Sequence, residues 1–221
     1  MRHLEQELTS LRQDVVEMWR LVISQVGKSG EALLSFDKDL AMQVSMREKK
    51  VDAYELKIDS FCENIIALHQ PVAIDLRFVL AVLKINTNLE RIGDFANSIS
   101  RLVVKYPSIS MDAEIITQTN LRAMIEEVKK MLTQGLEAFE SEKSTIAASI
   151  FSEDSIVDNL NDNAAKIIAK YIEANPDRAF ECLQLIGAFR KLERLGDHCS
   201  NIAEEIFFYL DAKILKHAPK L

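Results

Sequence analysis

Four pairs of acidic residues in this chain share one spacing, an Asp or Glu followed four residues later by Asp. The pairs are Glu48 and Asp52, Glu90 and Asp94, Asp154 and Asp158, and Glu193 and Asp197. Residues four apart on a helix point from the same face, so each pair presents its carboxylates together. Carboxylate oxygens suit iron, manganese, magnesium and calcium ions. The spacing therefore indicates metal-binding chemistry, although a chain with 34 acidic residues also contains such pairs by chance.

The positions of the pairs are more informative than their spacing. In the first half, Glu48 and Asp94 are equally far from Pro71, and so are Asp52 and Glu90. A proline disfavours helical geometry in the residue before it, so a helix is expected to end there. In the second half, the acid pairs are centred in the same way on an Asn-Pro break. Because residues equally far from the turn of an antiparallel hairpin face each other, each half is expected to gather four carboxylates at one level.

Such a group of like charges raises the free energy of the fold unless cations neutralise it. Arg91 and Arg194 each follow the first acid of a pair and could supply positive charge. Adjacent residues on a helix point about 100° apart, however, so we favour a metal ion over salt bridges alone. Gly93 and Gly196 lie beside the acids and permit close approach, either of an ion or of a tightly crossing helix.

A six-residue motif occurs twice and divides the chain into two halves. Leu-Glu-Arg-Ile-Gly-Asp at 89–94 returns as Leu-Glu-Arg-Leu-Gly-Asp at 192–197, with one conservative change. An internal repeat of this kind predicts two copies of one structural unit. We expect the units to comprise residues 1–108 and 109–221.

Apolar residues recur in alternating steps of four and three along most of the chain, which predicts long amphipathic helices. Six glycines and four prolines are few for 221 residues and favour helices over sheets. The predicted fold is all-α: two tandem, pseudo-symmetric three-helix bundles with spectrin-like up-down-up connections. Six long helices are expected at about residues 4–36, 40–69, 71–105, 112–140, 144–174 and 177–213.

Composition excludes several classes of protein. The net charge of −7 argues against nucleic acid as a partner, since phosphate binding needs a clustered cationic face. No apolar run reaches the roughly 20 residues that cross a bilayer, so direct membrane insertion is not expected. The three cysteines, Cys62, Cys182 and Cys199, cannot pair completely, and together with the absence of an apolar signal segment they favour the cytoplasm.

The chain is not expected to be an enzyme. It has no Gly-rich phosphate loop, no recognisable nucleophile–base pair and no Cys/His zinc set. A di-iron helical-bundle enzyme would need Glu-x-x-His, and the residues three before His69, His198 and His217 are not glutamates.

These motifs resemble the PhoU family of bacterial phosphate-signalling proteins over nearly the whole chain. The likeness rests on the repeated six-residue motif, the acid pair in each preceding helix, and the Pro-Val-Ala-Ile-Asp-Leu-Arg stretch at 71–77. It implies a multinuclear metal cluster in each repeat, held by the eight acids named above. Iron is the first expectation, with zinc, manganese or magnesium as alternatives.

The resemblance also implies a function. Family members are negative regulators of phosphate uptake and of the phosphate-starvation (Pho regulon) response. They are thought to link the ATPase subunit of a phosphate ABC transporter to a membrane sensor histidine kinase. We therefore expect a cytoplasmic protein that reaches the inner membrane only through partners. Exposed acidic ridges that metal ions bridge would favour a homodimer.

Some positions leave alternatives open. Family motifs often carry His after the last Asp, and His198 does so here, whereas Phe95 takes this place in the first half. A ligand role for His198 is therefore undecided. Asn97 and Asn201, one turn further along, could orient the ligands. The alternative function is a structural helical scaffold that binds no metal.

Overall fold

Seven α-helices, of which one is short, account for most of the part of the chain that the computed structural model describes, residues 2–106 and 112–212. They are α1 (Arg2–Ser35), α2 (Lys38–His69), α3 (Ala73–Lys105), α4 (Ala113–Gln118), α5 (Leu121–Ser141), α6 (Ser144–Ala174) and α7 (Ala179–Asp211), with a 3-10 turn at Pro176–Arg178. No strand occurs within these ranges. The predicted all-α fold is confirmed.

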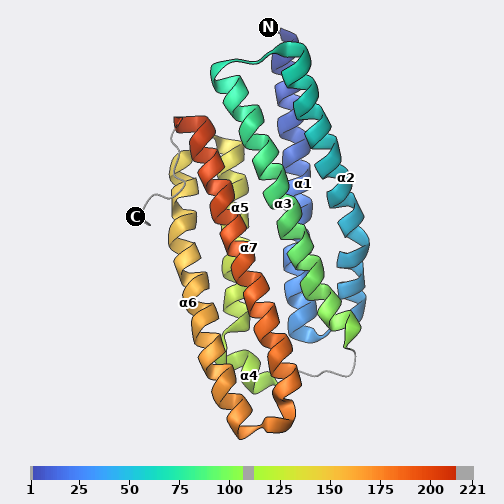
Figure 1. Cartoon of the computed structure of the whole chain (residues 1–221), viewed down its shortest axis with the longest axis vertical. Coiled ribbons are helices and arrows are strands. Elements are labelled where there is room, and N and C mark those ends of the chain that lie inside the picture. Colours follow the sequence, from blue (N-terminus) through green and yellow to red (C-terminus); the bar gives the residue numbers. More distant parts are fainter. Residues whose placement is uncertain (1, 107–111, 213–221) are drawn as a thin grey trace.

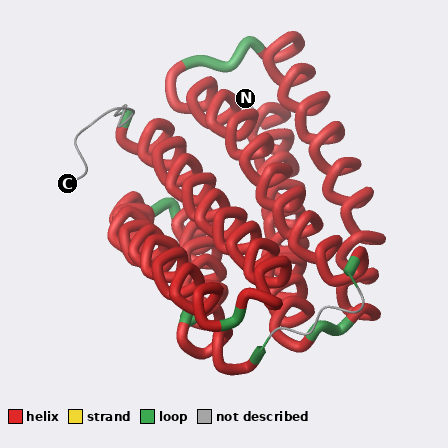
Figure 2. The backbone as a smooth tube through the Cα atoms, turned by 60° about the horizontal axis from the view of Figure 1, so that its bottom comes forward, coloured by secondary structure: helices red, strands yellow, loops and turns green. Residues whose placement is uncertain are grey.

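The long helices form two bundles that lie side by side (Figure 1). Helices α1, α2 and α3 pack against one another, and so do α5, α6 and α7. The bundles meet where α3 packs against α7 and α1 against α5, and Figure 2 shows the same packing from a second direction. The predicted unit boundary at 108/109 and the predicted helix end at residue 213 lie outside the described residues.

The turn between α2 and α3 differs from the prediction. Pro71 was expected in the first turn of the third helix, but α3 begins at Ala73 with Val72 as its N-cap. Gln70 caps α2 in the left-handed region at φ 46°, and Val72 is extended at φ −129°, so the chain passes Pro71 before helical hydrogen bonds resume. At the start of α2, the side chain of Asp37 accepts a hydrogen bond from the backbone N–H of Leu40, as an N-cap should.

The helix expected at 112–140 is broken into α4 and α5. Asn120 adopts the left-handed conformation at φ 54°, which asparagine tolerates better than most residues. The hydroxyl of the preceding Thr119 donates to the backbone carbonyl of Ile115 at 2.6 Å. Such side-chain bonds compete with helix formation, so this local pair overrides the apolar pattern around it.

One continuous apolar core runs through both bundles. Trp19 of α1 is fully buried, and its indole Nε1 donates to the backbone carbonyl of Leu132 on α5 at 3.0 Å. The rings of Phe78, Phe139 and Tyr209 meet at one end of the contact between the bundles. Shared burial of this kind fixes the two bundles against each other, and with them the helices that carry the acid pairs.

Within the described ranges, no helix is long and apolar enough to cross a membrane.

Candidate functional site

Helices α2 and α3 bring the first four acids together. Glu48 and Asp52 lie on α2, and Glu90 and Asp94 lie on α3. Burial raises the pKa of Glu48, and a hydrogen bond shared with Asp94 together with the charges of Asp94 and Asp52 raises it further. Glu48 therefore faces Asp94 across the hairpin, as their equal distances from Pro71 predicted.

Glu90 is the most strongly perturbed acid of this group. Burial raises its pKa to about 7, and the charges of Asp94 and Glu55 add to the effect. The side chain of Glu90 is 17% exposed, against 41% for that of Asp94. Glu55, one turn beyond Asp52 on α2, was not among the predicted site residues. Glu55 and Asp59 have the same four-residue spacing as the predicted pairs, which could have indicated that Glu55 belongs to the site. Other acidic pairs in the chain share this spacing, so the spacing alone did not single out Glu55.

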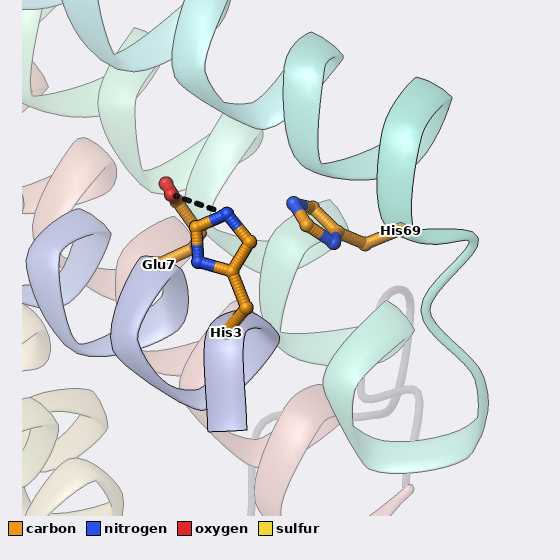
Figure 3. A group of neighbouring side chains, drawn as sticks. All are labelled: His3, Glu7 and His69. Carbon is orange, nitrogen blue, oxygen red and sulfur yellow. Dashed lines mark ion pairs between the residues drawn. The ribbon is translucent and has the colours of Figure 1, made fainter. Parts of the chain in front are cut away.

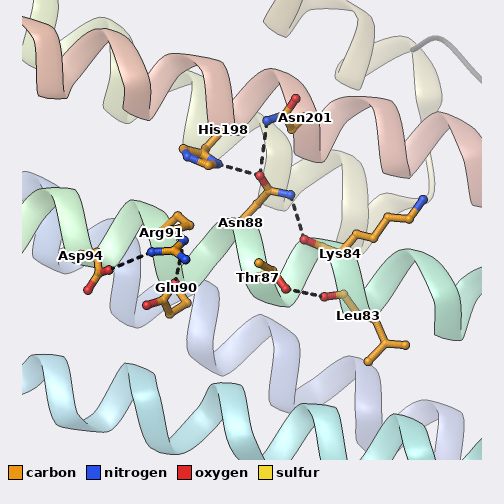
Figure 4. Close-up of polar contacts among 9 residues, drawn as sticks. All are labelled: Leu83, Lys84, Thr87, Asn88, Glu90, Arg91, Asp94, His198 and Asn201. Carbon is orange, nitrogen blue, oxygen red and sulfur yellow. Dashed lines mark hydrogen bonds and ion pairs between the residues drawn. The ribbon is translucent and has the colours of Figure 1, made fainter.

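Arg91 lies between the acids of its own motif (Figure 4). Its Nε is 3.6 Å from Glu90 Oε2, and its Nη1 is 3.6 Å from Asp94 Oδ2. The flexible side chain thus reaches both acids in spite of the angle between neighbouring helix positions. Arg91 lowers the pKa of Glu90, yet that pKa remains raised overall. Salt bridging is therefore realised in part, but it does not neutralise the group.

Asn97 contacts Glu48, which was one of the possibilities that the sequence left open. Its amide donates to the carboxylate of Glu48 and accepts a hydrogen bond of 2.8 Å from the hydroxyl of Ser45. Asn97 is 2% exposed, so these bonds fix its side chain in the interior. Asn201 is placed differently: it is exposed on α7, and its amide lies 3.5 Å from Asn88 Oδ1 on α3.

The second four acids form a similar group between α6 and α7. Burial raises the pKa of Glu193, and the charges of Asp197, Asp158 and Asp154 raise it further, opposed by Arg194. Asp154 is 6% exposed. This group repeats the electrostatic pattern of the first half on the other bundle.

The two motif glycines make room for different neighbours. A Cβ placed on Gly196 would lie 3.2 Å from Asp154 Oδ1, so this glycine admits an acid of the opposite helix. A Cβ on Gly93 would instead lie 3.3 Å from Oε1 of Gln25, on α1. Gln25 is completely buried, and its amide has no hydrogen-bond partner among the described residues. The motif glycine therefore faces a buried amide in the first half and a carboxylate in the second half.

His198 lies at the contact between the bundles (Figure 4). Its Nδ1 is 2.7 Å from Asn88 Oδ1 on α3, and its ring centroid is 5.7 Å from that of Phe95. Burial lowers the pKa of His198. The Nδ1 atom of His198, in the second half, is therefore occupied by its contact with Asn88 of the first half.

The donor chemistry of both acid groups fits hard or borderline metal ions. All eight predicted side chains offer carboxylate oxygens, which such ions accept. Among the described residues, these acids do not bring three ligand oxygens within 4.8 Å of one another. Mutual repulsion between carboxylates favours such a spread arrangement.

A family model for the PhoU domain matches residues 15–103 and residues 121–206. The chain belongs to the PhoU family. All eight predicted acids lie within the two matched segments. The predicted resemblance is thereby confirmed.

Two relatives named as PhoU proteins are similar to this chain over most of their length. The phosphate-specific transport system accessory protein PhoU homolog of Zymomonas mobilis is 32% identical over 209 residues, covering 95% of this chain and 87% of its own. The PhoU accessory protein of Escherichia coli K12 is also 32% identical, covering 96% of this chain and 86% of its own. The crystal structure of PhoU from Pseudomonas aeruginosa superposes with a TM-score of 0.88 at 31% identity, covering 95% of this chain and 99% of that one.

Proposed function

We propose that this chain is an accessory protein of a phosphate transport system and a negative regulator of phosphate uptake and of the phosphate-starvation response. The observation that carries the proposal is similarity to PhoU accessory proteins over 95–96% of this chain and 86–87% of theirs, together with the PhoU family match to the two segments that contain the acid groups. No catalytic step is part of this role.

We place a multinuclear metal cluster in each half, held by Glu48, Asp52, Glu90 and Asp94 in the first. The second would be held by Asp154, Asp158, Glu193 and Asp197. Iron is the first choice, with zinc, manganese or magnesium as alternatives. When bound, the metal supplies positive charge that neutralises crowded carboxylates. The raised pKa values of Glu48, Glu90 and Glu193 support this assignment, because burial first and neighbouring carboxylates second disfavour the charged form of each group, and a bound cation would favour it.

The regulatory role requires partners. We propose that the protein, as a cytoplasmic homodimer, contacts the ATPase subunit of a phosphate ABC transporter and a membrane sensor histidine kinase, and so reaches the inner membrane. The names of the relatives support association with a phosphate transport system.

A second candidate function is a helical scaffold that binds no metal. The ion pairs from Arg91 to Glu90 and to Asp94 favour it, since they neutralise part of the first acid group without any ion.

Two measurements test these proposals separately. Deletion of the gene should derepress phosphate-scavenging genes in phosphate-rich medium, and unchanged expression would overturn the regulatory role. Metal content, measured on protein purified without chelators, should fall by about half in the Glu90→Ala/Asp94→Ala variant while its helical content is retained. Wild-type protein that carries no metal, together with unchanged stability of the Asp94→Ala and Asp197→Ala variants, would favour the scaffold instead.

A further inference from the structure

We propose that His3, Glu7 and His69 form a second kind of metal site, for zinc, which joins the start of α1 to the end of α2. One ligand atom from each residue lies within 4.8 Å of the other two, and among the described residues they alone form such a group of three. Figure 3 shows the three side chains gathered between the two helix ends.

Two helices position these residues independently. His3 and Glu7 are four apart on α1 and so lie on one face, with His3 Nε2 3.8 Å from Glu7 Oε1. His69 is the last residue of α2, and the next residue, Gln70, caps that helix with a bond from its N–H to the Ile66 carbonyl. The rings of His3 and His69 meet edge to face, with centroids 5.3 Å apart. Local helix geometry and tertiary packing thus deliver both imidazoles to one place.

The donor set matches zinc chemistry. Two imidazole nitrogens and one carboxylate oxygen are common zinc ligands, and a tetrahedral ion holds its ligand atoms about 3.3–3.5 Å apart. The His3 side chain is 74% exposed and that of Glu7 31%, so small rotations can close the remaining distance and solvent can supply the fourth ligand. An ion pair between His3 and Glu7 would leave His69 with a ring contact alone, whereas a zinc ion would use a ligand atom from all three side chains.

This site is distinct from the acid groups in place and in chemistry. His69 is 17 residues beyond Asp52 on the same helix, which corresponds to roughly 25 Å along the axis. Its nitrogen donors favour zinc, whereas the acid groups offer oxygen alone. Zinc here would hold the α1 and α2 ends together and would leave the motif carboxylates untouched.

The test uses full-length protein without an affinity tag, because a polyhistidine tag would itself bind zinc. Zinc is titrated into wild type and into His3→Gln, Glu7→Gln and His69→Gln in competition with a chromophoric chelator. Loss of one ligand should weaken the site at least about tenfold, since even the loss of a group that only supports a ligand weakens metal affinity 10–100-fold. Glu5→Gln is the matched control, because it removes an exposed carboxylate from the same end of α1 that belongs neither to this site nor to the acid groups, and its zinc affinity should equal that of wild type.

Anomalous scattering at the zinc edge from zinc-soaked crystals locates the ion directly. A peak between the three side chains is expected in wild type and should vanish in His69→Gln. Zinc at the acid groups would give separate peaks and would not be mistaken for this site. Equal zinc affinity in wild type and His69→Gln, or crystals without a peak at this position, would overturn the proposal.

Discussion

Lys84 on α3 and Glu205 on α7 form an ion pair of 3.0 Å across the contact between the two bundles. The Glu205 side chain is 6% exposed, whereas that of Lys84 is 50% exposed. A buried carboxylate is stable only when a cation or several hydrogen bonds satisfy it. Lys84 therefore stabilises the packing of one half against the other.

Replacing Lys84 by Met keeps the apolar stem and removes the charge that Glu205 requires. We expect the free energy of unfolding to fall by about 1–3 kcal/mol, the range for a buried polar group left unsatisfied. Lys129→Met is the control, because Lys129 pairs with Glu126 where both side chains are well exposed, and such pairs contribute about 0–1 kcal/mol. Urea denaturation measures both, and equal losses would contradict the role of burial.

Gly196 and Gly187, both on α7, should respond in opposite ways to substitution by alanine. A Cβ at Gly187 meets only the tip of the Lys191 side chain at 3.8 Å, so Gly187→Ala should stabilise the helix by about 0.5–1 kcal/mol. A Cβ at Gly196 would meet Asp154 Oδ1 at 3.2 Å and Val157 at 3.4 Å. In Gly196→Ala, these close contacts should cancel the gain in helix stability and displace Asp154. Thermal unfolding measures the change in stability, and the metal content of the second half measures the effect on Asp154.

The raised pKa of Glu90 predicts a pH dependence in metal-free protein. Its pKa is about 7 in the folded protein against 4.5 as an ordinary value, so the folded state holds this proton more tightly than the unfolded state does. The stability from Glu90 is fully present below about pH 4.5 and is lost as pH rises through about 7. Glu90→Gln should reduce the fall in unfolding free energy between pH 5 and pH 7.5, measured with a chelator present, whereas Glu173→Gln, at an exposed site, should not.

The cysteine thiols should be unreactive in the native protein. Cys62, Cys182 and Cys199 are all buried, and burial raises the pKa of each, that of Cys62 to about 12. Because the thiolate is the reactive form, modification by a disulfide reagent at pH 8 should be at least about a hundredfold slower in native protein than in denaturant. Rapid labelling of folded protein would mean that the helices open frequently.

The long helices were predictable because their apolar residues recur at helical spacing, and this pattern depends only on neighbours in sequence. The facing of Glu48 and Asp94 followed from the same logic, since a hairpin relates residues equally far from its turn. The break at Thr119 and Asn120 was missed because two residues with local hydrogen-bonding preferences outweighed a longer periodic pattern.

Contacts that depend on tertiary packing could not be predicted from the sequence. Gln25 against Gly93 and Asn88 against His198 depend on how α1 and α7 approach α3, which no spacing along one helix reveals. The action of Arg91 on both acids depends on the rotamer of a flexible side chain. The sequence therefore indicated the level at which the acids face each other and named Arg91 as a source of positive charge, but it could not show that Arg91 reaches both acids.

The packing of α3 against α7 also brings together residues that are adjacent to the acid groups of the two halves. Phe95 directly follows Asp94, and the Arg194 guanidinium lies 5.2 Å from the centre of its ring. Arg194 in turn directly follows Glu193. One aromatic–guanidinium contact therefore joins the residue after Asp94 to the residue after Glu193, so the two acid groups lie close to the same stretch of the α3–α7 interface.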